Sequence, residues 1–210
     1  MIKIKNLHKK FKNNYILNDI NLTLEDRGCI AIVGANGSGK SVLLNIICGI
    51  IKPDSGYIEI NDLVLGKNLD FIPNAGIIIN NPNMVEHLSL YDNLMLISTI
   101  KNLPNTKIAI DKLLKYFDIY DKKDTKFKDA SQGMKQKARI IQALMEPSKI
   151  LILDEPTNAL DKKSIKKLLD LLLSLKNNKL IIITSHNEND ISYLADNVYE
   201  INDGNLYQLT

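Results

Sequence analysis

Residues 34–41 read Gly34-Ala35-Asn36-Gly37-Ser38-Gly39-Lys40-Ser41 and match the pattern G-x-x-x-x-G-K-[ST]. They follow the apolar run 29–33, which predicts a buried strand, and they open a segment that predicts a helix through residue 48. Glycines in this setting let successive backbone N–H groups point at the β- and γ-phosphates of a nucleotide. The lysine adds a point charge to the same phosphates, and the final serine hydroxyl can ligate Mg²⁺. The full pattern predicts a nucleoside triphosphate site and leaves ATPase, GTPase and small-molecule kinase open.

The segments on either side of this stretch alternate between short apolar strands and amphipathic helices. That alternation predicts an α/β fold whose mostly parallel sheet is covered on both faces. The middle of the chain predicts three helices instead, with Ser89 as the N-cap of the first. We therefore expect a single domain over residues 1–210, with a core formed by 1–79 and 145–210 and a helical insertion at about 80–144. The expected strands cover residues 2–5, 20–24, 29–33, 57–60, 63–65, 76–79, 150–153, 180–184 and 198–201. The first expected helix begins inside the glycine-rich loop and runs through residue 48, and the others cover residues 90–100, 107–117, about 133–144, 162–175 and about 188–194.

The composition is that of an ordinary globular chain, with 45% hydrophobic and 24% charged residues among 210. Its net charge of +3, from 27 basic and 24 acidic residues that are interspersed, gives no reason to expect a nucleic-acid partner. Cys29 and Cys48 lie in apolar runs, and we interpret them as buried side chains in a reducing compartment. No signal peptide is evident, and no apolar run approaches the roughly 20 residues that span a bilayer. We expect a cytoplasmic protein, whose membrane part, if it has one, is another chain.

Two carboxylates end the strand expected at residues 150–153. If this strand end lies beside the phosphate loop, Asp154 can hold the coordination sphere of Mg²⁺ and Glu155 can act as general base on an attacking water. Without the phosphate loop, both acids would simply end a strand before Pro156. His186 follows the strand expected at residues 180–184, where a histidine is usually only a hydrogen-bonded residue. One α/β unit after the acidic pair, it can reach the γ-phosphate, which we hold as a hypothesis.

Further stretches carry a family pattern: ASQGMKQ at residues 130–136, NALD at residues 158–161, and an aromatic residue, Phe11, near the start. Together with the phosphate loop and the acidic strand, they resemble the ATP-binding subunit of ABC transporters over essentially the whole chain. In that family they would be the signature segment, the D-loop and the aromatic that stacks on adenine, for which Tyr15 is a second candidate. His186 resembles the switch histidine. Within that family, the chain most resembles the bacitracin- and lantibiotic-type export ATPases.

The resemblance implies the ABC type of P-loop NTPase, with an antiparallel β part near the N-terminus, and it removes the GTPase and kinase alternatives. It also implies two ATPase subunits that meet head to tail and sandwich two ATP molecules. The Ser131 hydroxyl and the Gly133 N–H, with Gln132 between them, would grip the γ-phosphate bound by the other subunit. The D-loop at that dimer contact would comprise Ala159, Leu160 and Asp161.

The chain departs from the family pattern at several positions. Val42 stands where a hydroxyl commonly touches the α-phosphate, but the backbone N–H remains, so we expect a modest loss of affinity. Gln132 and Met134 replace the usual glycine and glutamine of the signature. Asn80 stands where a glutamine usually reaches Mg²⁺ or the attacking water, and its shorter side chain would need a bridging water.

The function that we expect is the ATP- and Mg²⁺-dependent motor subunit of a membrane exporter. It would act at the inner face of the cell membrane through a separate permease, contacted by residues 84–96, with a second copy of the chain as the other ATPase. The alternative is a soluble ABC-type ATPase that acts on a non-transport assembly. The candidate site residues are Phe11, Gly34, Ala35, Asn36, Gly37, Ser38, Gly39, Lys40, Ser41, Val42 and Asn80 for the nucleotide; Ser41, Asn80 and Asp154 for Mg²⁺; and Glu155 and His186 for catalysis.

Overall fold

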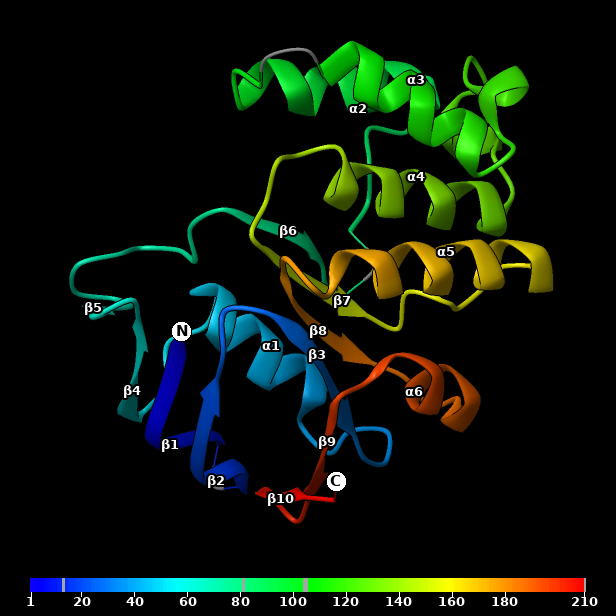
Figure 1. Ribbon diagram of the computed structural model, residues 1–210. Helices are drawn as coiled ribbons and strands as arrows, with labels where there is room; N and C mark the ends of the chain where they lie inside the picture. Colours follow the sequence, from blue (N-terminus) through cyan, green and yellow to red (C-terminus); the bar gives the residue numbers. More distant parts are fainter. Residues whose placement is uncertain (13, 81, 104–105, 210) are drawn as a thin grey trace.

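Two sheets of different kinds form the body of the molecule (Figure 1). The computed structural model describes residues 1–12, 14–80, 82–103 and 106–209. One sheet has the strand order β10-β9-β3-β8-β7-β6; it is parallel from β9 to β6, and the β9–β10 pair is antiparallel. This confirms the expected α/β fold with a mostly parallel sheet. Its strands are β3 (Gly28–Val33), β6 (Ala75–Ile78), β7 (Ile150–Asp154), β8 (Leu180–Thr184), β9 (Asn197–Asn202) and β10 (Asn205–Gln208).

The other sheet is antiparallel, in the order β2-β1-β4-β5, and confirms the expected antiparallel β part. Its first two strands form a hairpin that extends well beyond the residues 2–5 and 20–24 expected as strands. The extension is mostly polar and exposed, so hydrophobic alternation carries no strand signal there, and backbone pairing across the hairpin forms the strand instead. The strands are β1 (Ile2–Phe11), β2 (Asn14–Leu24), β4 (Ser55–Ile60) and β5 (Leu63–Val64).

The edge strand β10 was not among the expected strands. It pairs with β9 across a turn at Asp203 and Gly204, whose φ angles are 48° and 78°. An Asp-Gly pair with positive φ at both residues is the preferred two-residue hairpin turn. The Asp203-Gly204 dipeptide is therefore the sequence feature that indicates a hairpin here. Residues 205–208 themselves are too polar to be recognised as a strand by their hydrophobicity.

Side chains of the central strands alternate between two hydrophobic cores. Ile152 of β7 and Ile182 of β8 pack with α1 (Lys40–Cys48) and the antiparallel sheet. Their neighbours Leu151 and Ile181 pack with helices on the opposite face. Because both faces are buried, these strands appear in the sequence as continuous apolar runs.

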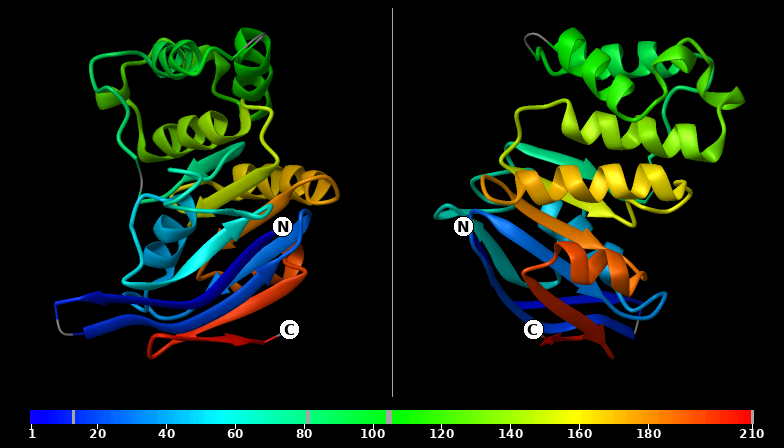
Figure 2. Two further views of the ribbon diagram at one scale, coloured as in Figure 1. Left: turned by 90° about the vertical axis from the view of Figure 1, so that its left-hand side faces the viewer. Right: turned by 45° about the vertical axis from the view of Figure 1, so that its right-hand side comes forward.

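The helix α4 lies between the central sheet and the outer helices α2 and α3 (Figure 2). Ser89 is the N-cap of α2, as expected, and accepts a hydrogen bond from the Asp92 N–H at 2.9 Å. Two 3₁₀ turns, Tyr120–Lys122 and Phe127–Asp129, lie between α3 and α4. The division of the chain at about residues 80 and 144 stays a prediction. The other helices are α2 (Leu90–Ile100), α3 (Thr106–Tyr116), α4 (Gln132–Leu144), α5 (Lys162–Leu175) and α6 (Glu188–Leu194).

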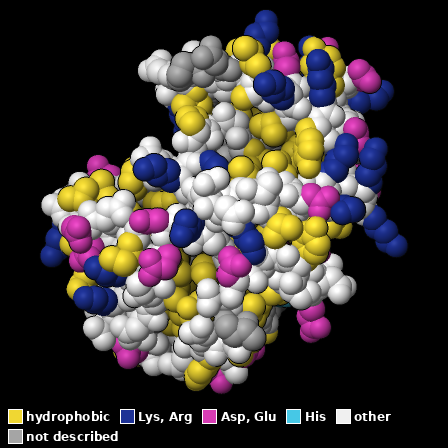
Figure 3. All heavy atoms as spheres, in the orientation of Figure 1, with side chains coloured by type: hydrophobic (Ala, Val, Ile, Leu, Met, Phe, Trp, Pro, Cys, Tyr) yellow, Lys and Arg dark blue, Asp and Glu magenta, His cyan; other side chains and the backbone are white. Residues whose placement is uncertain are grey.

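Acidic and basic side chains are mixed over much of the face drawn in Figure 3. Both cysteines are buried, as expected, and burial raises the pKa of each thiol to about 12. Across the described residues, no helix combines the length and the apolar character that a membrane crossing requires.

Candidate functional site

The loop between β3 and α1 is closely packed from both sides. A side chain at Gly34, whose φ is 141°, would bring its Cβ within 2.5 Å of the Ile201 carbonyl oxygen of β9. At Gly39, where φ is 108° and α1 begins, a Cβ would lie 3.0 Å from the Ile16 carbonyl oxygen of β2. Only glycine fits at these two positions, so the loop can curl tightly in front of the helix N-terminus.

Lys40 points back into this curl. Its ammonium nitrogen donates hydrogen bonds to the carbonyl oxygens of Gly34 at 2.8 Å and Ala35 at 3.0 Å, and the residue is only 7% exposed. Beside it, the buried Ser38 hydroxyl has no hydrogen-bond partner among the described residues. A buried cation, an unpaired hydroxyl and a helix N-terminus on one loop form an arrangement suited to a phosphate group.

Ser41 and Asp154 meet although 113 residues separate them in the sequence. The Ser41 hydroxyl donates to Asp154 Oδ2 at 2.8 Å, and the Thr184 hydroxyl donates to Asp154 Oδ1 at 2.6 Å. Thr184 also accepts a hydrogen bond from the Glu155 N–H at 2.9 Å. The ends of β7 and β8 are thereby connected to the first turn of α1.

This pair of oxygen groups fits Mg²⁺. A hydroxyl and a carboxylate lie side by side at the edge of the loop, and magnesium prefers a few protein oxygens with water and phosphate oxygens completing its octahedron. Within the described ranges, no group of three or more His, Cys, Asp and Glu side chains is placed to hold a metal without such additional ligands. Ser41 and Asp154 are therefore the residues that would hold the ion.

Glu155 and His186 form a second pair. His186 Nε2 lies 3.1 Å from Glu155 Oε1. Burial raises the pKa of the Glu155 carboxyl, while His186 and Lys40 act in the opposite direction. Glu155 has a φ of 48°, a left-handed conformation that is uncommon for a residue other than glycine. A carboxylate of raised pKa next to a histidine can accept a proton from water.

An open cleft of about 710 Å³ brings most of the sequence-predicted residues together. Ile16 is an additional wall residue that the sequence did not indicate. Gly34 and Ala35 line a neighbouring groove, which His186 shares. The cleft is lined by Phe11, Ile16, Asn36, Gly37, Gly39, Lys40, Ser41, Val42, Asp154, Glu155 and His186.

Ser38, Asn80 and the alternative aromatic Tyr15 line neither the cleft nor the neighbouring groove. Asn80 is exposed with a φ of 56°, and the structure does not bring it to Ser41 and Asp154, so its role stays a prediction. Tyr15 is 52% exposed and carries the Lys10 ammonium 4.0 Å above its ring, whereas Phe11 reaches the cleft.

The signature segment and the D-loop lie against each other. Ser131 is the N-cap of α4, and its hydroxyl accepts from the Met134 N–H at 3.2 Å. A Cβ at Gly133 would lie 3.1 Å from the Ala159 carbonyl oxygen. Asp161 is the N-cap of α5 and lies 3.5 Å from the Lys137 ammonium. Gln132 and Leu160 belong to the same two segments, and neither segment lines the 710 Å³ cleft.

Sequence reasoning missed three polar residues that support the site. Thr184 bridges Asp154 and Glu155. Its position at the end of a predicted strand, directly before Ser185 and His186, is the sequence feature that could have indicated this role. Gln136 and Arg139, on α4, reach the backbone after β7 and the segment after β6, and nothing in the local sequence indicates these contacts.

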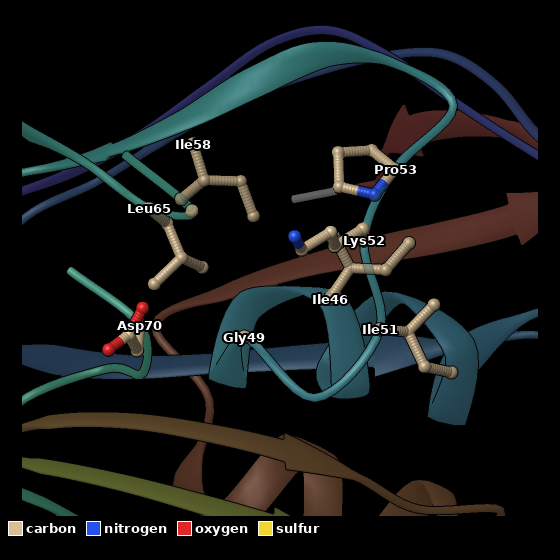
Figure 4. A pocket seen from close by; sticks show the side chains of 9 residues that line it. Ile46, Gly49, Ile51, Lys52, Pro53, Ile58, Leu65 and Asp70 are labelled. Carbon is tan, nitrogen blue, oxygen red and sulfur yellow. The ribbon is translucent and has the colours of Figure 1, made fainter. Parts of the chain in front are cut away.

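A separate pocket, of about 440 Å³ including the solvent at its open mouth, lies at the other end of α1, beneath β4 and β5 (Figure 4). Its walls are mostly apolar, with Ile46, Ile58 and Leu65 among them, and Lys52 and Asp70 also line it. It contains none of the predicted site residues.

Residues 17–158 match the protein family described as "ABC transporter". The uncharacterized ABC transporter ATP-binding protein YybJ of Bacillus subtilis (strain 168) is 37% identical over 98% of this chain and 94% of its own length. The lantibiotic transport ATP-binding protein SrtF of Streptococcus pyogenes is 32% identical, over 98% of this chain and 89% of its own. The methionine import ATP-binding protein MetN of Clostridium acetobutylicum is 36% identical, over 97% and 67%.

A solved structure has the same fold. The dimeric post-hydrolysis state of the ATP-binding cassette MJ0796, bound to ADP and Pi, matches with a TM-score of 0.88 at 25% identity. The match covers 100% of this chain and 99% of that one.

Proposed function

Because the chain belongs to the ATP-binding subunits of ABC transporters, we propose that it is the motor of an exporter, in which two copies hydrolyse ATP head to tail and drive a separate permease. Family membership makes it an ATP-binding ATPase. The roles of individual residues, the use of Mg²⁺, the identity of the partners and the direction of transport are the content of the proposal.

One observation carries the assignment of the site: the phosphate loop, the Ser41–Asp154 pair and the Glu155–His186 pair all open into one cleft. The nucleotide phosphates would lie along the loop, with Lys40 donating to them in place of the Gly34 and Ala35 carbonyls. Phe11, 48% exposed at the cleft, offers its ring to the base of the nucleotide. When bound between Ser41 and Asp154, Mg²⁺ would neutralise phosphate charge.

Hydrolysis then depends on the second pair. The Glu155 carboxylate accepts the proton of the water that attacks the γ-phosphate, and its raised pKa makes it a stronger base than an exposed glutamate. His186 Nε2 lies 3.1 Å from Glu155 Oε1 and faces the same cleft. Thr184 fixes the backbone from which the glutamate projects.

A second copy would complete the site. Ser131, Gln132 and Gly133 lie outside the cleft of their own chain, as required of groups that act on the nucleotide of a partner. The contact of Gly133 with Ala159 joins this segment to the D-loop. The dimeric state of MJ0796 supports a pair of copies.

The permease would contact residues 84–96. Val85 and Leu96 are exposed apolar side chains, at 37% and 40%, and His87 is exposed between them. Such a surface suits a short helix of a membrane protein, and it would place the ATPase at the inner face of the membrane. The name of SrtF supports transport of a lantibiotic-type peptide, whereas the name of MetN is that of an importer.

Capture of the tagged chain from detergent-solubilised membranes of its host tests the transport proposal. We expect a multi-helix membrane protein to co-purify, and we expect Leu96→Glu to reduce its recovery. Ile108→Glu, which places the same charge at an exposed position of α3, is the matched control and should not. A partner that is consistently soluble would instead favour the non-transport alternative.

The direction of transport needs a separate measurement. A host that lacks this gene should become more sensitive to a lantibiotic while growing normally on limiting methionine. Loss of growth on limiting methionine with unchanged lantibiotic sensitivity would contradict export.

A further inference from the structure

Two buried polar side chains on α4 form a hydrogen-bonded connection that ends at Glu155. Gln136 and Arg139, 2% and 7% exposed, lie three residues apart on one face of the helix. Arg139 Nη1 donates to Gln136 Oε1 at 3.3 Å, and Gln136 Nε2 donates to the Pro156 carbonyl oxygen at 3.0 Å and to that of Glu155 at 3.5 Å. Because the guanidinium only donates, it holds the amide oxygen on its own side and directs the amide NH₂ to the two carbonyls.

The backbone at the end of this connection is strained. Glu155 has a φ of 48°, a conformation that is unfavourable for a residue other than glycine unless its surroundings hold it. Thr184 holds the Glu155 N–H at 2.9 Å, and the carbonyl accepts from the Asn158 N–H at 3.2 Å as well as from Gln136. The direction of the catalytic side chain therefore depends on contacts made on both sides of its own peptide unit.

The other end of the connection lies after β6. Arg139 Nε donates to the Pro82 carbonyl oxygen at 3.0 Å, and the guanidinium lies 5.9 Å from the centre of the Phe127 ring. No ion pair to Arg139 occurs within the described residues, and burial lowers the pKa of its guanidinium. Desolvation of an unpaired cation is costly, so its few hydrogen bonds hold it in a defined place.

We infer that Gln136 and Arg139 are positioning residues for Glu155 and connect the Pro82 carbonyl to the catalytic base. The inference rests on the proposed function, because it takes Glu155 as the base. Pro82 leads directly into residues 84–96, the proposed permease contact. A displacement of the Pro82 peptide moves Arg139, which turns the Gln136 amide and releases the Glu155 and Pro156 carbonyls.

Steady-state ATPase kinetics on the full chain test this connection. Gln136→Met keeps the side-chain length and removes all three hydrogen bonds of the amide, and we expect kcat to fall by about 10- to 100-fold, since small misplacement of a catalytic group has effects of this size. The KM for ATP should stay within about 2-fold, because the phosphate loop is untouched. Arg139→Met should act in the same direction, and Arg139→Lys, which keeps a donor and the charge, should recover part of the loss.

A double-mutant cycle separates a connection from two independent packing effects. Gln136→Met/Arg139→Met should be no slower than the slower single variant, because both changes interrupt one path. Gln142→Met, on the same helix and outside the connection, is the matched control and should leave kcat unchanged. Multiplicative losses in the double variant would overturn the inference, as would an unchanged kcat in Gln136→Met.

Amide hydrogen exchange distinguishes positioning from loosening of α4. Both single variants should speed exchange of the Asn158 N–H, which donates to the Glu155 carbonyl, while the Met134 N–H at the start of α4 stays protected. Faster exchange at both amides would mean that the helix itself has loosened and would contradict a positioning role.

Glu155→Gln measured in parallel keeps the two proposals apart. If that variant retains turnover, Glu155 is not the base, and the positioning role of Gln136 and Arg139 is overturned with it. If it loses turnover while Gln136→Met and Arg139→Met retain theirs, only the connection is overturned.

Discussion

Glu155 combines three features: a partly buried carboxyl, a histidine nitrogen at 3.1 Å and a left-handed backbone. Asp154, its neighbour in the sequence, is held differently, by hydroxyl donors on both of its oxygens. Asp154 is the last residue of β7, and the left-handed backbone of Glu155 turns the chain directly after it. Two consecutive acids can therefore serve different purposes, one beside the metal position and the other beside the attacking water.

The first prediction concerns the base. Glu155→Gln should lower kcat by at least about 100-fold, because general-base catalysis contributes on the order of 10²–10⁴-fold. Nucleotide contacts remain, so the ATP-bound dimer should accumulate, as measured by size-exclusion chromatography with ATP. Undiminished hydrolysis would show that another group accepts the proton.

The second prediction concerns the lysine of the loop. Lys40→Ala removes the cation that faces the phosphates, so the Kd for ATP, measured by calorimetry, should rise by about 10-fold or more. His186→Ala is the informative contrast, since it should slow hydrolysis and leave the Kd nearly unchanged. Equal losses of binding in both variants would place His186 among the binding groups instead.

At the scale of elements, ion pairs to a single carboxylate link α3 and α5. Asp118, just after α3, receives ion pairs from Lys163 at 2.9 Å and Lys167 at 2.8 Å, both on α5. These two lysines therefore connect α5 to the end of α3. Their hydrogen bonds lower the pKa of Asp118 to about 2.

The third prediction follows from that shift. A carboxylate whose pKa is lower in the folded state stabilises the fold above its unfolded pKa of 3.8, and this contribution disappears as the pH falls toward about 2. Asp118→Asn should therefore lower the Tm at pH 7 and make no difference near pH 2. Because the pairs are exposed, the effect should be small and should shrink in high salt. Asp121→Asn is the control, and an equal loss there would indicate a general charge effect.

At the scale of the whole molecule, the proposed function divides each ATP site between two copies of the chain. Its cleft contains most of the phosphate loop, the Ser41–Asp154 pair and Glu155, while Ser131 and Gly133 lie outside that cleft. In a head-to-tail pair, each cleft would take its missing groups from the other copy. That arrangement makes hydrolysis a property of the pair, which suits a motor whose opening and closing drive another protein.

The fourth prediction tests this sharing of residues. Lys40→Ala and Ser131→Arg should each inactivate a dimer of identical copies. Mixing the two variants creates dimers in which both defects fall in one site and the other site is intact, so about a quarter of the wild-type activity should return. No recovery on mixing, with mixed dimers demonstrated by differently tagged copies, would contradict a shared site.

The sequence alone determined the phosphate loop, the apolar strands and most helix ends, because each depends on neighbours in the chain. Gly34 and Gly39 mark a tight turn, Ser89 a helix cap, and residues 150–155 a buried strand that ends in acids. It also carried enough family pattern to indicate the fold class. The strand segments that the sequence failed to predict also have a local cause: residues 6–11 and 205–208 are too polar to be recognised as strands.

Only the tertiary structure decided which distant groups meet. Ser41 reaches Asp154 because the strand order places β7 one strand away from β3, and the strand between them, β8, brings Thr184 to both acids. The contacts of Gln136 and Arg139 depend on how α4 packs against the sheet, and the exposed place of Asn80 depends on a left-handed turn after β6. Such contacts join residues from separate elements, and their energies depend on packing that no stretch of sequence encodes by itself.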